Sequence, residues 1–175
     1  MKLRSYADVR VASKGFSLAE VLVATGIVGV ALAPIVFLLT TSIRQASVVQ
    51  DQLIAGQLAQ EGVEIVRAVR DENWINAAPG RPFYSGLAAG TWLVDYRRAA
   101  LLPFSAGEPL RIEAGTGFYY HGAGVPSRFF RTIHVVHNPS ASPREIRVQS
   151  VVSWTTRGIP FSVTVEDHLF DWLPI

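Results

Sequence analysis

The fold of this chain is decided by an apolar stretch near its start, FSLAEVLVATGIVGVALAPIVFLL, which occupies residues 16–39. The stretch contains a single ionisable side chain, that of Glu20. A helix rises about 1.5 Å per residue, so a helix of this length covers roughly 36 Å, whereas a hydrocarbon core is about 30 Å thick. Residues 16–39 are therefore long enough and apolar enough to cross a membrane once.

The basic charge of the chain lies almost entirely before this stretch. Residues 1–15 contain four basic side chains and one acidic side chain, whereas the rest of the chain contains 12 basic and 13 acidic ones. The formal net charge of +2 therefore comes from a short basic head. A nucleic-acid-binding surface needs basic residues clustered on the folded part of a protein. The sequence thus predicts no direct binding of nucleic acid.

A basic head followed by an apolar run permits several interpretations. The first is a secretory signal peptide cleaved after the small residues Ala31-Leu32-Ala33, which would release a secreted domain. Pro34 argues against it, because the scissile amide would be tertiary and because the apolar run continues beyond that point. The second is an uncleaved single-pass anchor, whose basic head stays in the cytoplasm and whose C-terminal part lies outside.

A third interpretation accounts for the junction Lys14-Gly15-Phe16-Ser17-Leu18-Ala19-Glu20. A short basic leader that ends in Gly, followed by Phe and by Glu as the fifth mature residue, resembles the cleavage and methylation motif of type IV prepilins. The resemblance implies cleavage after Gly15 by prepilin peptidase on the cytoplasmic face and N-methylation of the new Phe16 amine. It also implies that the Glu20 carboxylate meets the N-terminal ammonium of a neighbouring subunit.

The physical chemistry of Glu20 agrees with such a role. A charged side chain at the centre of a membrane-spanning helix costs about 2.5–3.5 kcal/mol on insertion scales, and less near the edge. A compensating charge on a neighbouring chain would explain its presence. The alternative is that Glu20, one turn into the run, reaches back to the membrane interface.

Three helix-disfavouring residues interrupt the same stretch, namely Gly26, Gly29 and Pro34. Relative to Ala, a Gly costs about 1 kcal/mol and a Pro about 3 kcal/mol in a helix interior. In membranes these residues allow close helix packing and local kinks. The pilin resemblance implies that the helix bends or unwinds here inside a filament. Gly and Pro are also common in membrane-spanning helices without any such role.

A second helical segment follows from Thr40 to about Arg70, with no Pro and with apolar residues at helical spacing. The more polar side of this segment consists of Gln50, Gln57, Glu61 and Glu64. So broad an apolar surface predicts packing on two sides, against the C-terminal part and against neighbouring helices, although burial in its own domain alone remains the alternative. The two apolar rows are Val49, Leu53, Gly56, Ala59, Val63 and Val66, and Ile54, Leu58, Gly62, Ile65 and Val69.

The C-terminal part has the composition of an antiparallel sheet. Strands are predicted at 91–97, with Trp92, Val94 and Tyr96 on one face, and at 110–113 and 129–137. A hairpin is predicted between 145–154 and 161–169. Together with the long helix this gives an α+β fold, in which the N-terminal helix packs against an antiparallel sheet, and the pilin resemblance implies the same lollipop architecture. The expected inward faces of the hairpin are Ile146, Val148, Val152 and Trp154, and Phe161, Val163, Val165 and Leu169.

Motifs for catalysis or metal binding are missing from the sequence. There is no cysteine, and none of the four histidines falls in a metal-binding pattern. His134 and His137 are three apart on a predicted strand and are expected on opposite faces. No enzyme activity, metal or cofactor is therefore predicted.

One group of oxygen ligands remains, Asp71, Glu72 and Asn73. Some pilin-like proteins use such residues for calcium, but exposed acids in a loop at the end of a helix are the commoner explanation. We adopt that explanation here.

The sequence thus predicts four parts: a leader at 1–15, a transmembrane or filament-core helix half at 16–39, an amphipathic half at 40–72 and a β-rich head at 73–175. The resemblance implies a minor pilin or pseudopilin of a type IV pilus or a related type II secretion or competence machine. Its partners would be other pilins, prepilin peptidase, the inner-membrane assembly platform and the membrane. It would cross the inner membrane once, with a cytoplasmic N-terminus and an extracytoplasmic head. The alternative is an anchored binding module that does not polymerise.

Overall fold

The computed structural model describes residues 15–76, 82–137 and 144–172. Contacts between residues divide the chain into two compact units, Met1–Ala46 and Ser47–Ile175. The described residues form one long helix, α1 (Leu18–Ile75), and antiparallel strands that pack against its C-terminal half. The predicted α+β fold is therefore confirmed.

In the first unit α1 continues without interruption through Gly26, Gly29 and Pro34. Every residue from Gly15 to Thr40 is exposed, so this half of the helix has no core of its own. Its threonine hydroxyls turn back onto the helix, as when Thr25 Oγ1 donates to the Val21 carbonyl oxygen at 2.7 Å. These polar groups are thus satisfied within the helix.

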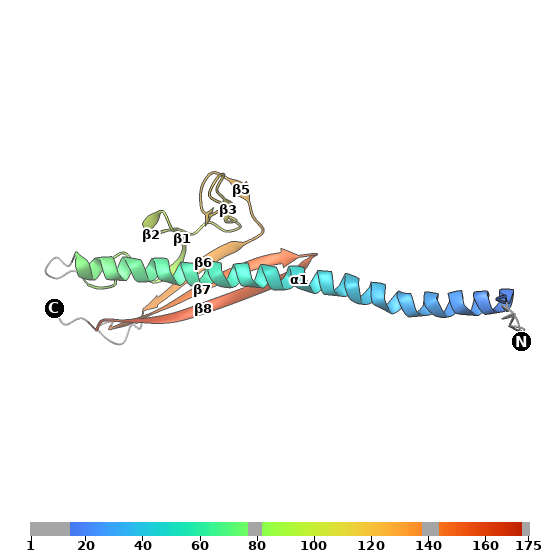
Figure 1. Cartoon of the computed structure of the whole chain (residues 1–175). Coiled ribbons are helices and arrows are strands. Elements are labelled where there is room, and N and C mark those ends of the chain that lie inside the picture. Colours follow the sequence, from blue (N-terminus) through green and yellow to red (C-terminus); the bar gives the residue numbers. More distant parts are fainter. Residues whose placement is uncertain (1–14, 77–81, 138–143, 173–175) are drawn as a thin grey trace, which may run out of the picture. The chain divides into compact units, whose positions relative to one another are not determined.

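The second unit contains a five-stranded antiparallel sheet that lies along α1 (Figure 1), with strand order β2-β1-β6-β7-β8. A smaller antiparallel sheet of short strands has the order β4-β3-β5. The strands of the large sheet are β1 (Gly90–Asp95), β2 (Arg98–Pro103), β6 (Phe130–His137), β7 (Glu145–Thr156) and β8 (Ile159–Phe170), and those of the small sheet are β3 (Arg111–Ile112), β4 (Tyr119–Tyr120) and β5 (Val125–Pro126).

The predicted hairpin is confirmed as β7 and β8, which pair in one continuous register from Thr156–Ile159 to Glu145–Phe170. A two-residue turn joins them, with φ of 53° at Arg157 and 79° at Gly158. Two successive positive φ values match the right-handed twist of a hairpin, and this is why Gly is favoured at its second position. The expected inward residues alternate correctly, with Ile146, Val148, Val152, Trp154 and Leu169 buried and Phe161, Val163 and Val165 partly buried.

The core lies between the sheet and one face of α1. Gly62 is buried at a close approach of the helix to the sheet. A Cβ built there would contact Ser150 Oγ and would lie 3.0 Å from Ile133 Cδ1 and 3.1 Å from Arg131 Cδ. The apolar row predicted for the middle helix is only partly covered, since Val49 and Leu53 remain 52% and 65% exposed. The buried face of α1 consists of Asp51, Ala55, Leu58, Ala59, Gly62, Val63, Val66, Val69 and Asn73.

The strand predicted at 91–97 is wrong at its end. The chain turns at Tyr96–Arg97 into β2, and the register between β1 and β2 shifts between Val94 and Asp95. Such an irregularity breaks the simple alternation of faces, so Asp95 is buried although its position predicted the polar face. The strand expected at 110–113 shortens to Arg111–Ile112.

The last described residues return to the helix. Trp172 packs edge-on against Trp74 of α1, with ring centroids 4.9 Å apart, although its side chain remains largely exposed.

Candidate functional site

The residues predicted for processing and assembly lie at the start of α1. Gly15 and Phe16 precede the helix, and Glu20 lies in its first turn. Phe16 is 81% exposed, and Glu20 is also exposed. Gly15, Phe16 and Glu20 are therefore close together along the chain and open to a second molecule.

Gly26, Gly29 and Pro34 lie further along the same helix. A Cβ built at Gly26 or Gly29 would meet no atom within 4 Å. The intrachain packing therefore gives no reason for glycine at these two positions, unlike Gly62. Pro34 donates no backbone hydrogen bond, because its ring replaces the N–H, yet α1 continues through it.

The apolar stretch itself forms one extended exposed surface. By length and composition, the first half of α1 is a candidate single membrane span. Large apolar side chains such as Leu22, Phe37 and Leu38 are each more than 60% exposed. So much contiguous apolar surface marks a site of contact with a membrane or with other chains.

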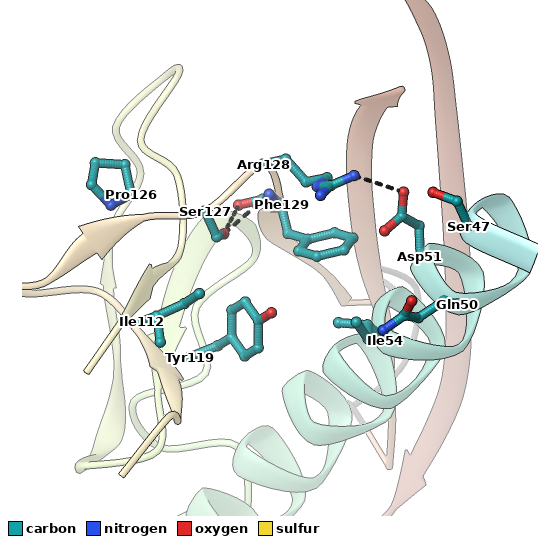
Figure 2. Close-up of a pocket in the computed structure, with 10 residues that line it drawn as sticks. All are labelled: Ser47, Gln50, Asp51, Ile54, Ile112, Tyr119, Pro126, Ser127, Arg128 and Phe129. Carbon is teal, nitrogen blue, oxygen red and sulfur yellow. Dashed lines mark hydrogen bonds and ion pairs between the residues drawn. The ribbon is translucent and has the colours of Figure 1, made fainter. Parts of the chain in front are cut away.

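The second unit contains a separate polar cavity of about 340 Å³, between α1 and the small sheet. Figure 2 labels the residues that line it. Asp51 is the acidic residue in its lining, and the Asp51 side chain is only 8% exposed. Arg128 Nη1 donates to Asp51 Oδ2 at 2.9 Å, and Thr156 Oγ1 donates to the same oxygen at 3.0 Å. Asp51 therefore ties α1 to the loop before β6 and to the end of β7.

That loop is also held by backbone hydrogen bonds. The Ser127 amide donates to the Leu110 carbonyl oxygen at 2.9 Å, and the Leu110 amide donates to that of Phe129 at 2.8 Å. Tyr119 packs edge-on against Phe129, with ring centroids 5.9 Å apart. The wall of the cavity is thus fixed by contacts within the chain.

A buried ion pair lies further along α1. Arg131 of β6 is fully buried, and its Nη1 lies 3.1 Å from Glu61 Oε1. The guanidinium also donates to the carbonyl oxygens of Leu58 at 3.1 Å and Val94 at 3.0 Å. Burial lowers the pKa of Arg131, and the charge of Glu61 opposes the shift. This network fastens the helix to the sheet.

Two histidines of the head have shifted pKa values. Burial lowers the pKa of His121, and the charge of Arg131 adds to the effect, while Glu108 and Asp95 oppose it. His168 on β8 has a raised pKa, because Glu145 and then Glu166 accept hydrogen bonds from its ring.

The other two histidines lie on opposite faces of β6, as expected. His134 Nδ1 lies 3.2 Å from Thr91 Oγ1, and His137 Nε2 lies 2.6 Å from the Leu87 carbonyl oxygen. Within residues 15–76, 82–137 and 144–172, no group of three His, Cys, Asp or Glu side chains is arranged to hold a metal ion.

Asp71, Glu72 and Asn73, at the end of α1, do not form the exposed loop that we expected. All three residues lie within the helix, and Asn73 is buried. Its Nδ2 donates to the carbonyl oxygens of Phe83 at 2.8 Å and Ser85 at 2.7 Å. Asp71 pairs with Arg70 at 2.7 Å. Asn73 is therefore a structural link between the helix end and the segment that follows.

Sequence reasoning missed the polar residues that link α1 to the strands and loops of the second unit, above all Asp51, Arg128 and Arg131. One signal for Asp51 was available, since it lies four residues before Ala55 and seven before Leu58, on the same helical face as these buried residues. Nothing in the sequence names its partners, because Arg128 and Thr156 are brought near only by the fold.

Comparison of the chain with protein-family models, with curated proteins and with solved structures finds no match.

Proposed function

We propose that this chain is a minor pilin or pseudopilin, a structural subunit of a type IV pilus or of a related type II secretion or competence machine. The observation that carries the proposal is the Gly15-Phe16 junction with Glu20 four residues after Phe16, at the start of an apolar helical stretch whose residues are all exposed as far as Thr40. Such a helix needs a membrane before assembly and neighbouring helices afterwards.

Glu20 supports the polymer rather than a plain anchor. In an apolar bundle an ionised carboxylate is costly unless an opposite charge or hydrogen-bond donors lie close to it, because the low dielectric makes an unpaired charge expensive. Cleavage after Gly15 creates such a charge, the ammonium group of Phe16. The ammonium of one subunit and the Glu20 carboxylate of the next would then fix the axial register of the filament.

The rest of the α1 surface is consistent with a crowded assembly. Gly26 and Gly29 have open space around them, so a neighbouring helix can approach the backbone closely there. Val49 and Leu53 leave apolar surface uncovered on the head half of the helix. The lack of any cysteine, and so of the C-terminal disulfide loop of many major pilins, favours a minor subunit.

The proposal also fixes partners and location. Prepilin peptidase would process the leader, and the inner-membrane assembly platform would extract the subunit from the membrane. Before assembly the chain would cross the inner membrane once, with its head outside the cytoplasm. The chain is a substrate of processing and carries out no catalysis itself.

The intact mass and N-terminal peptide of the protein from native membranes test the proposal. A chain that begins at N-methylated Phe16 is the expected result. A chain that begins at Met1 contradicts it in favour of a single-pass anchored module that does not polymerise. A chain that begins at Pro34 contradicts it in favour of a secreted domain.

A further inference from the structure

The cavity beside Asp51 is lined by none of the residues that we propose for processing or assembly. Its volume of about 340 Å³ lies at the small end of the range of roughly 300–1,000 Å³ for ligand sites. It therefore has room for one small molecule or for one residue of a larger one.

The charge of the cavity is balanced. Among the described residues that line it, Asp51 and Arg128 are the only charged side chains, and they are paired with each other at 2.9 Å. An anion would have to compete with the Asp51 carboxylate for Arg128, and a cation would have to compete with Arg128 for Asp51. The balance thus favours a ligand without net charge.

The wall nevertheless has a large capacity for hydrogen bonds. Figure 2 shows the Gln50 amide and the Tyr119 hydroxyl pointing into the space between α1 and the small sheet. An amide and a phenol each donate and accept hydrogen bonds. Ser47 adds a hydroxyl, and the half-exposed Arg128 retains further N–H donors. A purely apolar ligand would leave these groups without partners, at a cost in free energy.

Apolar groups complete the lining. The Tyr119 ring and the side chains of Ile54 and Ile112 border the same space (Figure 2). The cavity thus offers donors and acceptors on one part of its wall and flat or branched apolar surface on another. A ligand that matches both parts carries neutral groups that donate and accept hydrogen bonds, together with apolar faces.

We propose that this cavity binds a single neutral sugar ring, either free or as the terminal residue of a glycan. A neutral pyranose has no charge, its hydroxyl groups both donate and accept, and the C–H groups of its faces can pack on Tyr119 and the isoleucines. The proposal does not depend on the pilin assignment, because every residue that lines the cavity belongs to the second unit, Ser47–Ile175.

The test uses the full-length chain in lipid nanodiscs that contain neither glycolipid nor sugar-based detergent. Methyl glycosides of glucose, galactose, mannose and N-acetylglucosamine are titrated and followed by saturation-transfer NMR, with inorganic phosphate and methylammonium as charged comparators. At least one glycoside is expected to bind saturably in the millimolar range, and neither ion is. A matching free reducing sugar then shows whether the glycosidic substituent contributes.

Two substitutions remove one polar group each and leave the Asp51–Arg128 pair in place. Gln50→Ala and Tyr119→Phe are each expected to weaken binding about fivefold, the equivalent of one net hydrogen bond. Gln57→Ala is the matched control, since Gln57 is the same residue, exposed on the same helix but outside the cavity lining. The Gln57→Ala variant is expected to bind the glycoside with the affinity of the unmodified chain.

Three outcomes overturn the proposal. No glycoside saturates a chain that still unfolds cooperatively; phosphate or methylammonium binds at the Asp51–Arg128 pair instead; or a glycoside binds with the same affinity to the unmodified chain and to both variants. The cooperative thermal unfolding of each variant shows that the head is folded in every arm.

Discussion

The Nη1 atom of Arg131 on β6 lies 3.1 Å from the Oε1 atom of Glu61 on α1, and the Arg131 side chain is completely buried. A buried guanidinium stays charged, so its counter-charge has to be supplied by the fold. Glu61 of α1 supplies this counter-charge, and it belongs to the polar side of the helix that the sequence predicts. This pair is therefore one of the contacts that hold α1 against the sheet, together with the hydrogen bond from Arg131 to the Leu58 carbonyl oxygen.

Replacing Glu61 is expected to destabilise the head. Loss of one partner from a fully buried ion pair costs about 3–5 kcal/mol, and the 35% exposure of the Glu61 side chain reduces the expected cost of Glu61→Gln to about 1–3 kcal/mol. Thermal unfolding followed by tryptophan fluorescence measures it. Glu64→Gln, an exposed acid on the same helix, serves as control and should change stability by less than about 1 kcal/mol. Equal effects of the two substitutions would contradict the role given to Glu61.

Substitution by alanine is expected to change stability in opposite directions at two glycines of α1, Gly62 and Gly56. Gly62→Ala places a methyl group against Ile133, Arg131 and Ser150, and such overpacking costs typically about 1–3 kcal/mol. Gly56→Ala meets no atom within 4 Å and gains up to about 1 kcal/mol of helix propensity. Melting temperatures of the two variants, measured side by side, check the difference in sign. A stable Gly62→Ala variant would mean that the helix can move away from the sheet.

Glu20 is expected to matter for assembly and not for cleavage. Glu20→Gln removes the charge that would pair with the ammonium of a neighbouring Phe16, and loss of about 1.4 kcal/mol already lowers an association constant tenfold. The fraction of the chain recovered in sheared filaments, relative to membranes, should fall about tenfold or more, with the mature N-terminus unchanged. An unaltered distribution would indicate that Glu20 only reaches back to the membrane interface.

His121 is expected to make the head sensitive to mild acid. Its folded pKa lies below the ordinary value of 6.5, so below about pH 6.5 the unfolded state binds more protons than the folded one. The contribution of His121 to stability is complete above that pH and is lost as the pH falls toward the lowered pKa. His121→Phe should remove this dependence below about pH 6.5, as judged from melting temperatures recorded over a series of pH values. Persistence of the acid sensitivity in the variant would assign it to other groups.

His168 provides a comparison of opposite sign. Its pKa is raised by Glu145 and Glu166, so its stabilising contribution is complete below about pH 6.5 and is lost as the pH rises through the raised value. His168→Gln should therefore reduce stability on the acid side of neutrality and have no effect at alkaline pH. Because the ring is exposed, the change should be smaller than that from His121→Phe. An effect confined to alkaline pH would reverse the sign argued here.

The pattern of apolar residues was sufficient for the elements with strong periodicity. It predicted the long helix, and it predicted the β7–β8 hairpin together with its inward face, because alternation over twelve-residue strands leaves one choice of face. It was insufficient at β1, where the register shift before Asp95 and the turn at Tyr96 depend on pairing with β2. The end of the helix was also misjudged, because the amide of Asn73 finds its acceptors at Phe83 and Ser85, in the segment that follows.

By itself, then, the sequence determined the parts of this protein that depend on neighbours along the chain. These are the apolar helix, the Gly15-Phe16 junction with Glu20 at a fixed spacing, and the alternating strands, because periodicity and spacing are local properties. Only the tertiary structure decided which polar residues meet. Asp51 and Thr156 are 105 positions apart, and Arg131 lies 70 positions after Glu61, yet each pair is in contact in the folded head. Such pairs depend on strand order and on the close approach of α1 at Gly62, and neither is written in a local pattern.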